Sequence, residues 1–295
     1  MYLPFDLNRR FAESIWLAVG FFGAAFVVFE LSDSSALTKV LRLFLSARGA
    51  DWAQTLFGLT GVAFGAAGVY AFYQWLLAYT KKKRAERRKM MREAAESLKY
   101  QYFQQPPPEF APHLSAFTKL RAQSLPPNSR ATGSGASNLL TQQTGNDLIA
   151  VFDHEVSVEY PNQDRDSFTF SETAYLVVSE RLALPYFQTQ PESAVGGAVG
   201  DFLKNRAGIT DVNFPQNPEF SKKYLLDASD PPRVEHLFTP PVLRFYEQKQ
   251  LYRTFGEGKM LCLSDLRYDS LDAAQIAARI NVLYDLYRLL KSPAP

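Results

Sequence analysis

The sequence predicts an α+β soluble domain with a mostly antiparallel sheet, preceded by two transmembrane α-helices. Two observations carry this prediction. Long apolar runs lie before Tyr79, whereas after Asn146 the hydrophobic pattern changes to the period of two that is typical of strands. The whole-chain composition hides this division, because 46% hydrophobic and 21% charged residues is ordinary globular usage.

Two apolar segments carry the membrane prediction. Phe11–Leu31 has its only charges, Glu13 and Glu30, at its two ends, and Leu56–Tyr79 has no charge at all. A hydrocarbon core of about 30 Å requires roughly 20 helical residues, which both segments provide. A buried core helix is the alternative for either segment, and a cleaved signal peptide is a further alternative for the first. We favour an uncleaved anchor because no small-residue cleavage site follows.

A basic block directly after the second segment predicts the orientation. Its eight basic residues are Lys81, Lys82, Lys83, Arg84, Arg87, Arg88, Lys89 and Arg92. Arg9 and Arg10 precede the first segment, so the positive-inside rule places both termini in the cytoplasm. The predicted location is a bacterial plasma (inner) membrane, crossed more than once. The lipid bilayer is the expected partner, with anionic headgroups held at about 1 kcal/mol per basic residue. A nucleic-acid partner is not expected, because this block is juxtamembrane.

The second segment also carries small residues at helical spacing. Gly58, Gly61, Gly65 and Gly68 would let helix backbones approach closely, which makes a homo-oligomer possible. In the preceding loop, apolar residues from Leu37 to Leu45 predict an amphipathic surface helix. A simple helical hairpin connection is the alternative there.

These patterns predict a division into six parts. They are 1–31, the N-terminal segment and first transmembrane helix; 32–55, an extracytoplasmic loop; 56–80, the second transmembrane helix; 81–105, a basic juxtamembrane helix; 106–145, a Pro/Ser/Gly-rich flexible linker; and 146–295, the cytoplasmic α+β domain. Pro106, Pro107 and Pro108 are expected to end the juxtamembrane helix. Within the linker, 110–125 is expected to form a short helix.

The elements of the domain follow from local patterns. Strands are predicted at 148–160, 168–179, 181–188 and 220–226, and a short helix at 192–206. Pro231 and Pro232 are expected to begin a further helix, which Pro240 and Pro241 are expected either to break or to restart. A hairpin is predicted at 251–264 with its turn at Gly256-Glu257-Gly258. A closing helix at 271–290 places on one face the apolar residues Ile276, Ile280, Leu283, Leu286, Tyr287 and Leu290.

A pattern between about Leu182 and Ser264 resembles an uncharacterised family of bacterial membrane-anchored domains of unknown function. The matching residues are Leu184, Pro185, Phe187, Pro191, Glu192, Asp211, Val212, Phe214, Pro218, Phe220, Ser221, Tyr224, Leu226, Asp230, Val234, Leu237 and Phe238. The chain departs from the family pattern at Ala228, where glycine is usual, and at His236. The resemblance implies a domain that follows a pair of membrane helices, and it brings no activity with it.

The search for chemistry gives no catalytic, cofactor-binding or metal residues. His113, His154 and His236 have no second ligand at a metal-binding spacing. In Asp153-His154-Glu155 the side chains alternate, so His154 is expected to face away from the other two on a solvated strand. Cys262, the single cysteine, is expected to be a buried, inert thiol. The glycines at 196, 197 and 200 lack the remainder of a phosphate-binding loop.

Three functions are therefore in competition. The first is a non-enzymatic inner-membrane protein whose cytoplasmic domain binds another protein or supports envelope assembly. The second is a membrane-anchored enzyme or small-ligand domain, for which the candidate residues are Asp211, Asp227, Asp230, Glu235 and His236. The third is a channel-like oligomer. Neither apolar segment carries the interior charge expected of an ion path, and this argues against a channel.

Overall fold

The structure is a computed structural model of the full chain, and it describes residues 47–123, 130–159, 167–191, 210–249, 253–265 and 271–291. The predicted first transmembrane helix, Phe11–Leu31, lies outside these residues. The predicted amphipathic loop helix and the predicted helix at 192–206 also lie outside them. The chain divides into two compact units, Met1–Glu86 and Arg87–Pro295, which are described separately.

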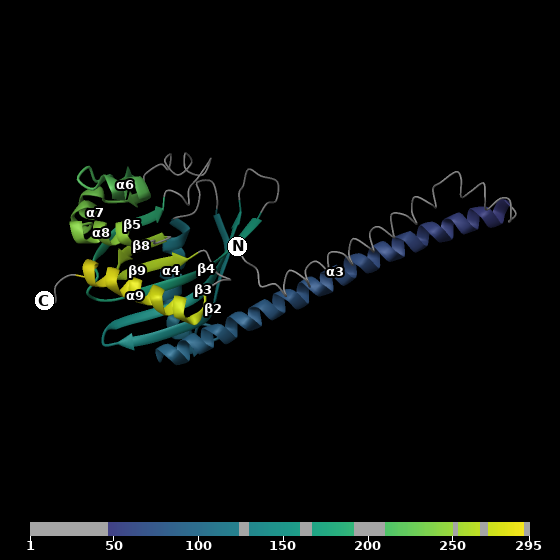
Figure 1. The fold of residues 1–295 in the computed structure, drawn as a ribbon, viewed down its shortest axis with the longest axis horizontal. Helices are drawn as coiled ribbons and strands as arrows, with labels where there is room; N and C mark the ends of the chain where they lie inside the picture. Colours follow the sequence, from purple (N-terminus) through teal and green to yellow (C-terminus); the bar gives the residue numbers. More distant parts are fainter. Residues whose placement is uncertain are drawn as a thin grey trace. The chain divides into compact units, whose positions relative to one another are not determined.

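The boundary between the units falls inside one helix, α3 (Ala47–Leu98). This helix contains the predicted segment 56–80 and residues 81–98 of the predicted juxtamembrane helix 81–105 (Figure 1). Across the described ranges, no helix combines the length and the apolar character needed to cross a membrane. The helix ends at Leu98, the next residue, Lys99, has a φ of 59°, and the amide of Tyr100 donates to the carbonyl of Ala95 at 2.8 Å. A left-handed residue therefore ends α3, and the prediction that Pro106–Pro108 would end it was wrong.

Within its described residues, the second unit contains a nine-stranded sheet in which every pairing is antiparallel. The strand order is β1-β2-β3-β4-β9-β8-β5-β7-β6. The strands are β1 Gln101–Phe103, β2 Arg130–Thr144, β3 Asp147–Glu159, β4 Ser167–Val178, β5 Leu184–Pro191, β6 Thr210–Asp211, β7 Tyr224–Ala228, β8 Arg253–Gly258 and β9 Met260–Asp265. The predicted α+β class with an antiparallel sheet is confirmed for the described part of this unit.

Helices cover both faces of this sheet. They are η1 Pro108–Phe110, α4 Ala111–Gln123, α6 Pro218–Lys223, α7 Pro231–Leu237, α8 Pro240–Gln248 and α9 Ala273–Leu290. Figure 1 shows α9 lying across β4 and β9, with α6, α7 and α8 gathered beside β5. The six apolar residues predicted for one face of α9 are all buried. Asp272 and Gln275 form a capping box that fixes where α9 begins.

The alternation of side chains along β3 and β4 separates two hydrophobic cores. Odd-numbered residues such as Val151 and Tyr175 pack with α9, α8 and the last turns of α3, where Met91 and Ala94 are fully buried. Even-numbered residues such as Phe152 pack with η1 and α4 on the opposite face. The sheet is therefore buried on both faces, as in a three-layer arrangement.

The prediction of a flexible linker at 106–145 was wrong. This segment contains η1, α4 and the whole of β2, which pairs with β3 from Arg130↔Glu159 to Thr144↔Asp147. Between Arg130 and Asn138, β2 contains two alanines, two glycines, two serines and one threonine, and of these only the threonine favours strands. Backbone pairing with β3 makes them a strand, and the domain therefore begins well before residue 146. The short helix expected at 110–125 is present as α4.

The strand predicted at 220–226 begins later than expected. Residues 218–223 form α6, with Pro218 at its first position, Glu219 in its first turn and lysines in its last turn, and β7 follows from Tyr224. These are helix start and stop signals that outweigh the apolar pattern of the segment.

The predicted hairpin is present as β8 and β9, but its turn lies two residues later than predicted. Gly256 is inside β8, and a Cβ at this position would overlap the ring of Phe187. Gly258 has a φ of 57°, so it occupies the turn position that favours glycine.

We expect Gly256→Ala to destabilise the domain by about 2 kcal/mol, because the fully buried ring of Phe187 must move to admit a methyl group. The matched control is Gly135→Ala in β2, where nothing lies within 4 Å of the added atom. Denaturant midpoints of the full chain measure both changes, and equal midpoints for the two variants would contradict this account of Gly256.

Candidate functional site

The most polar part of the interior lies where β3 pairs with β4. The cross-strand pairs Asp153↔Thr173 and His154↔Glu172 are adjacent, so they point to opposite faces of the sheet. All four side chains are at most 1% exposed. The structure thus buries one carboxylate on each face at the same place in the sheet.

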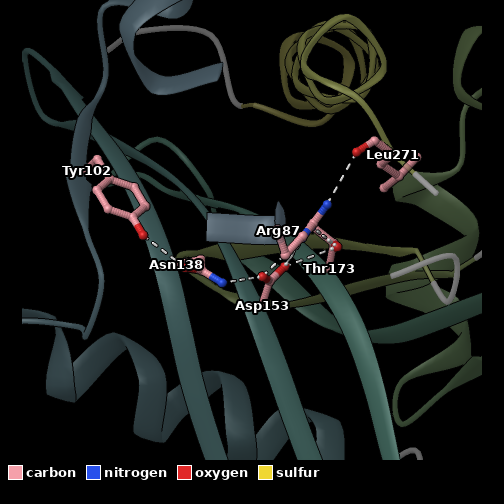
Figure 2. A network of polar contacts seen from close by, with 6 residues as sticks. All are labelled: Arg87, Tyr102, Asn138, Asp153, Thr173 and Leu271. Atoms are coloured by element: carbon pink, nitrogen blue, oxygen red, sulfur yellow. Dashed lines mark hydrogen bonds and ion pairs between the residues drawn. The ribbon is translucent and has the colours of Figure 1, made fainter. Parts of the chain in front are cut away.

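On the face covered by α3, Asp153 is held by Arg87. The guanidinium donates from Nη2 to Oδ1 of Asp153 at 2.7 Å and from Nε to Oδ2 at 3.1 Å (Figure 2). Nη2 also donates to the hydroxyl of Thr173 at 2.7 Å, and Nη1 donates to the carbonyl of Leu271 at 3.3 Å. Arg87 therefore connects α3 with β3, β4 and Leu271, which lies two residues before the start of α9.

The same network extends to the edge of the sheet. Asn138 donates from Nδ2 to Oδ2 of Asp153 at 2.8 Å, and its Oδ1 accepts from the hydroxyl of Tyr102 in β1 at 2.9 Å (Figure 2). Asn138 has a φ of 53° and lies in an irregular stretch of β2, which turns its side chain towards Asp153. We name Arg87, Tyr102, Asn138, Asp153 and Thr173 the Asp153 network.

On the opposite face, Glu172 is held by Arg121 of α4. Nε of Arg121 donates to Oε1 of Glu172 at 2.8 Å, and Ser264 of β9 donates to Oε2. His154 donates from Nδ1 to Oε1 at 3.3 Å, because a carboxylate can only accept. The edge of Phe117 packs against the histidine ring with centroids 4.9 Å apart. We name Arg121, His154, Glu172 and Ser264 the Glu172 network.

The surroundings of Glu172 decide its protonation. Burial alone would raise its pKa, but the charge of Arg121 and the hydrogen bonds from His154 and Ser264 lower the pKa to about 2. A carboxylate with such a pKa is ionised at neutral pH and binds protons too weakly for a general base. The Glu172 network therefore fixes a charge rather than exchanging a proton.

The structure corrects one prediction about Asp153-His154-Glu155 and confirms another. His154 faces away from Asp153 and Glu155, as expected from the alternation along a strand. The prediction of a solvated strand face was wrong, because Asp153 and His154 are buried and only Glu155 of the three is exposed. Two arginines from distant helices supply the compensating charges that the local sequence does not reveal.

The other singled-out residues lie apart from these networks. His236 is exposed and its Nδ1 is 2.7 Å from the carbonyl of Pro232, one helical turn earlier. His113 is half-buried, which lowers its pKa. Cys262 is fully buried, and burial raises the pKa of its thiol well above the ordinary value, so the expected inert thiol is what the structure contains.

The five residues considered for an enzyme do not share one role. Asp211 and Asp227 are paired across β6 and β7. Asp230 caps α7 by accepting from the amide of Arg233 at 3.3 Å. Glu235 and His236 are exposed on α7. Two of the five are thus brought together, and Asp230 has a capping role.

Sequence reasoning missed Arg87, Arg121 and Glu172 as interior charges. Arg87 was counted with the basic block, although Met91, Ala94 and Ala95 follow it at the spacing of one helical face. Glu172 is the single charge in the apolar run FTFSETAYLVV. An isolated charge on a hydrophobic stripe is the signal that could have identified both residues.

Within the described ranges, no group of three or more His, Cys, Asp or Glu side chains is placed to hold a metal ion. No family model and no curated protein matches the chain. One solved structure that is similar is the crystal structure of the mycobacterial trehalose monomycolate transport factor A, TtfA. Its TM-score is 0.44 at 10% identity, over 71% of this chain and 98% of that chain. A likeness of this degree assigns no ligand or activity to the chain.

We expect Arg87→Met to destabilise the domain by about 3–5 kcal/mol, because Asp153 would remain buried without its countercharge. Arg84→Met, an identical substitution at an exposed position of the same helix, should change stability by less than about 0.5 kcal/mol. Denaturant unfolding of the full chain in mild detergent measures both. The double variant Arg87→Met with Asp153→Leu should recover most of the loss, and a double variant no better than Arg87→Met alone would contradict the pairing.

Acid should destabilise the domain through Glu172. Its folded pKa of about 2 lies below the ordinary 4.5, so its contribution is complete above about pH 5 and is lost as the pH falls towards 2. The shift corresponds to about 3 kcal/mol. Glu172→Gln removes the titration, so its unfolding free energy should change less than that of the wild type between pH 7 and pH 3. Equal acid dependence in the two proteins would show that another group is responsible.

Proposed function

We propose that this chain is a non-enzymatic protein of the bacterial inner membrane, held there by Phe11–Leu31 and Leu56–Thr80, with a cytoplasmic α+β domain that binds another protein. The observation that carries the proposal is the surface of α3 between Leu56 and Thr80. Large apolar side chains are exposed there on successive turns, including Leu56 at 59% and Leu59 at 61%. The others are Val62, Val69, Tyr70, Phe72, Tyr73 and Leu76.

An exposed apolar surface of this kind is unfavourable in water. Each leucine or valine side chain that is exposed to water lacks the roughly 1.5–3 kcal/mol of stabilisation that its burial would contribute. At about 100° per residue, the exposed positions spread over more than half of the helix circumference. Soluble monomers rarely expose contiguous patches of this size, and lipid is a solvent that covers such a helix on all sides.

An aromatic ladder near the end of this segment supports the placement. Phe72 stacks on Trp75 at 5.8 Å, Trp75 stacks on Tyr79 at 5.5 Å, and the ammonium of Lys83 lies 5.8 Å from the Tyr79 ring. Tryptophan and tyrosine followed by lysine is the order expected from the apolar core of a bilayer to its headgroups. The ladder would therefore lie at the cytoplasmic interface.

The exposed residues of the basic block could contact anionic headgroups. Arg87 is buried against Asp153, whereas Lys81, Lys82 and Arg84 are exposed. Attraction to anionic headgroups of about 1 kcal/mol per exposed basic residue would add to the apolar anchorage. The same α3 thus has a membrane-facing part and a part that belongs to the sheet domain.

The hydrogen bonding of the buried carboxylates Asp153 and Glu172 favours a binding role over catalysis. Asp153 and Glu172 each accept several donors, and the hydroxyls of Thr173 and Ser264 are engaged with them. These groups stiffen a scaffold on which surface strands are displayed. A rigid scaffold with exposed strands suits recognition of another polypeptide.

Alkaline carbonate extraction of the full-length chain tests the membrane attachment. The chain should remain in the membrane pellet. Val62→Lys with Val69→Lys should increase the fraction of the chain released, because a lysine at the centre of a spanning helix costs roughly 2.5–3.5 kcal/mol and only Phe11–Leu31 then anchors the chain fully. Ala85→Lys with Ser97→Lys adds the same charge at exposed positions of α3 and should leave the chain in the pellet.

Release of the wild-type chain by carbonate would overturn the proposal. Orientation is tested separately by a reporter fused after Pro295, which should be active only in the cytoplasm. A reporter active only outside the cell would reverse the assigned topology.

A further inference from the structure

The pairing of β2 with β3 is interrupted twice. The register shifts between Ala131 and Gly133, and it shifts again between Ser137 and Leu140. Each shift places one extra residue on β2, as a β-bulge does. Residues 133–137 pair with β3 without interruption between the two shifts, so a bulge lies on each side of this segment.

The side chains of residues 133–137 specify the observed register only weakly. They are two glycines, two serines and one alanine. A slip by one residue reverses the face of every side chain, which is costly where a large apolar side chain leaves its core. Nothing lies within 4 Å of a Cβ added at Gly133 or Gly135. The side chains of Ser134 and Ala136, which a slip would bring to these two places, therefore have room.

The extra residue of the second shift can move to the first. The segment between the shifts would then advance by one position along β3, with Asn138 opposite Asp153 and Leu139 opposite Phe152. Residues 140–144 would keep their present partners on β3. A second register is thus compatible with the same remaining sheet.

One buried group would gain a suitable neighbour in this second register. Nε2 of His154 is buried and has no hydrogen-bond partner in the part of the chain that the structure describes. Ala136 lies opposite His154 in the observed register, and the slip would bring Ser137 to that position. A hydroxyl, which can donate to a ring nitrogen, would replace a methyl group.

Asn138 lies at the second shift in a conformation that few residue types adopt. Its φ of 53° is in the left-handed region, which asparagine tolerates better than alanine does. In this conformation its side chain donates to Asp153 at 2.8 Å and accepts from Tyr102 at 2.9 Å. Its amide donates to the carbonyl of Gln104 at 3.0 Å. An extended backbone at Asn138 would redirect both the amide and the side chain, so these three contacts belong to the observed register.

We propose that residues 133–137 of β2 have two registers on β3, and that the left-handed backbone of Asn138, held within the Asp153 network, selects the observed one. The inference goes beyond the binding role proposed above and does not depend on it. Asp153 accepts hydrogen bonds from both Arg87 and Asn138, so the last turns of α3 take part in the selection. The register decides which side chains β2 presents on each face of the sheet.

Pairs of cysteines in the full chain, in mild detergent, distinguish the two registers. Gly133→Cys with Ser157→Cys reports the observed register, in which these two residues are paired. Ser134→Cys with Ser157→Cys reports the slipped register, because Ser134 and Ser157 point to opposite faces in the observed one. Opposed residues of an antiparallel pair have Cα atoms about 4.5–5.5 Å apart, within disulfide range. The single native cysteine, Cys262, is fully buried and does not compete.

Asn138→Ala should raise the rate of disulfide formation in the slipped pair about tenfold, because alanine disfavours the left-handed backbone and lacks the side-chain hydrogen bonds. Asn138→Gly is the matched control. It removes the same side chain but accepts a positive φ, so the rate should rise by no more than about threefold. An unchanged rate in Asn138→Ala, or equal rates in the alanine and glycine variants, would overturn the proposal.

A further pair separates a slip from simple fraying of the strand. Ser134→Cys with Glu155→Cys corresponds to a slip in the opposite direction, so Asn138→Ala should leave its rate of disulfide formation unchanged. Equal rises in this pair and in the slipped pair would indicate fraying and would also overturn the proposal. Gly133→Cys with Ser157→Cys should still form a disulfide in Asn138→Ala, because both registers keep β2 on β3. Loss of this disulfide together with that of the slipped pair would show that the strand detaches, which contradicts a choice between two registers.

Discussion

The fold of the second unit depends on burying two carboxylates at one place in the sheet. Asp153 and Glu172 lie in neighbouring cross-strand pairs and face opposite layers, and each is compensated by an arginine from a different helix. A buried carboxylate is tolerated only when its charge is paired and its oxygens accept hydrogen bonds. The positions of α3 and α4 against the sheet, and the register of β3 with β4, are therefore constrained together. A shift of one residue in that register would separate each acid from its arginine.

These ion pairs specify an arrangement more than they stabilise it. Leucine-like side chains of similar volume would commonly give equal or greater stability, because both charges lose their hydration on burial. The apolar residues around them would permit several alignments of α3, since Met91, Ala94 and Ala95 are small or adaptable. Arg87, by contrast, has donors directed to Asp153, Thr173 and the carbonyl of Leu271, and only one rotation and height of the helix satisfies all three.

The sequence predicted the elements whose hydrophobic period is strong and local. The buried face of α9 is where the pattern placed it, and the β8–β9 hairpin and strands β3 to β5 lie within about three residues of their predicted positions. It failed where tertiary pairing decides the structure. The first half of β2 has the composition of a linker and becomes a strand because β3 offers its backbone groups. The Glu172 network could not be found from local patterns, since its members come from α4, β3, β4 and β9.

Because Arg87 and Met91 belong to the sheet domain, the domain cannot be excised at the apparent linker around residues 106–145. A fragment starting after Phe103 would lack the guanidinium opposite Asp153, the buried side chains of Met91, Ala94 and Ala95, and the strand that covers Leu139–Thr141. Proteolysis that separates the two units and leaves this domain intact would have to cut within α3 itself, upstream of Arg87. Such a separation therefore requires the helix to unwind first, and cleavage between residues 106 and 145 would not achieve it.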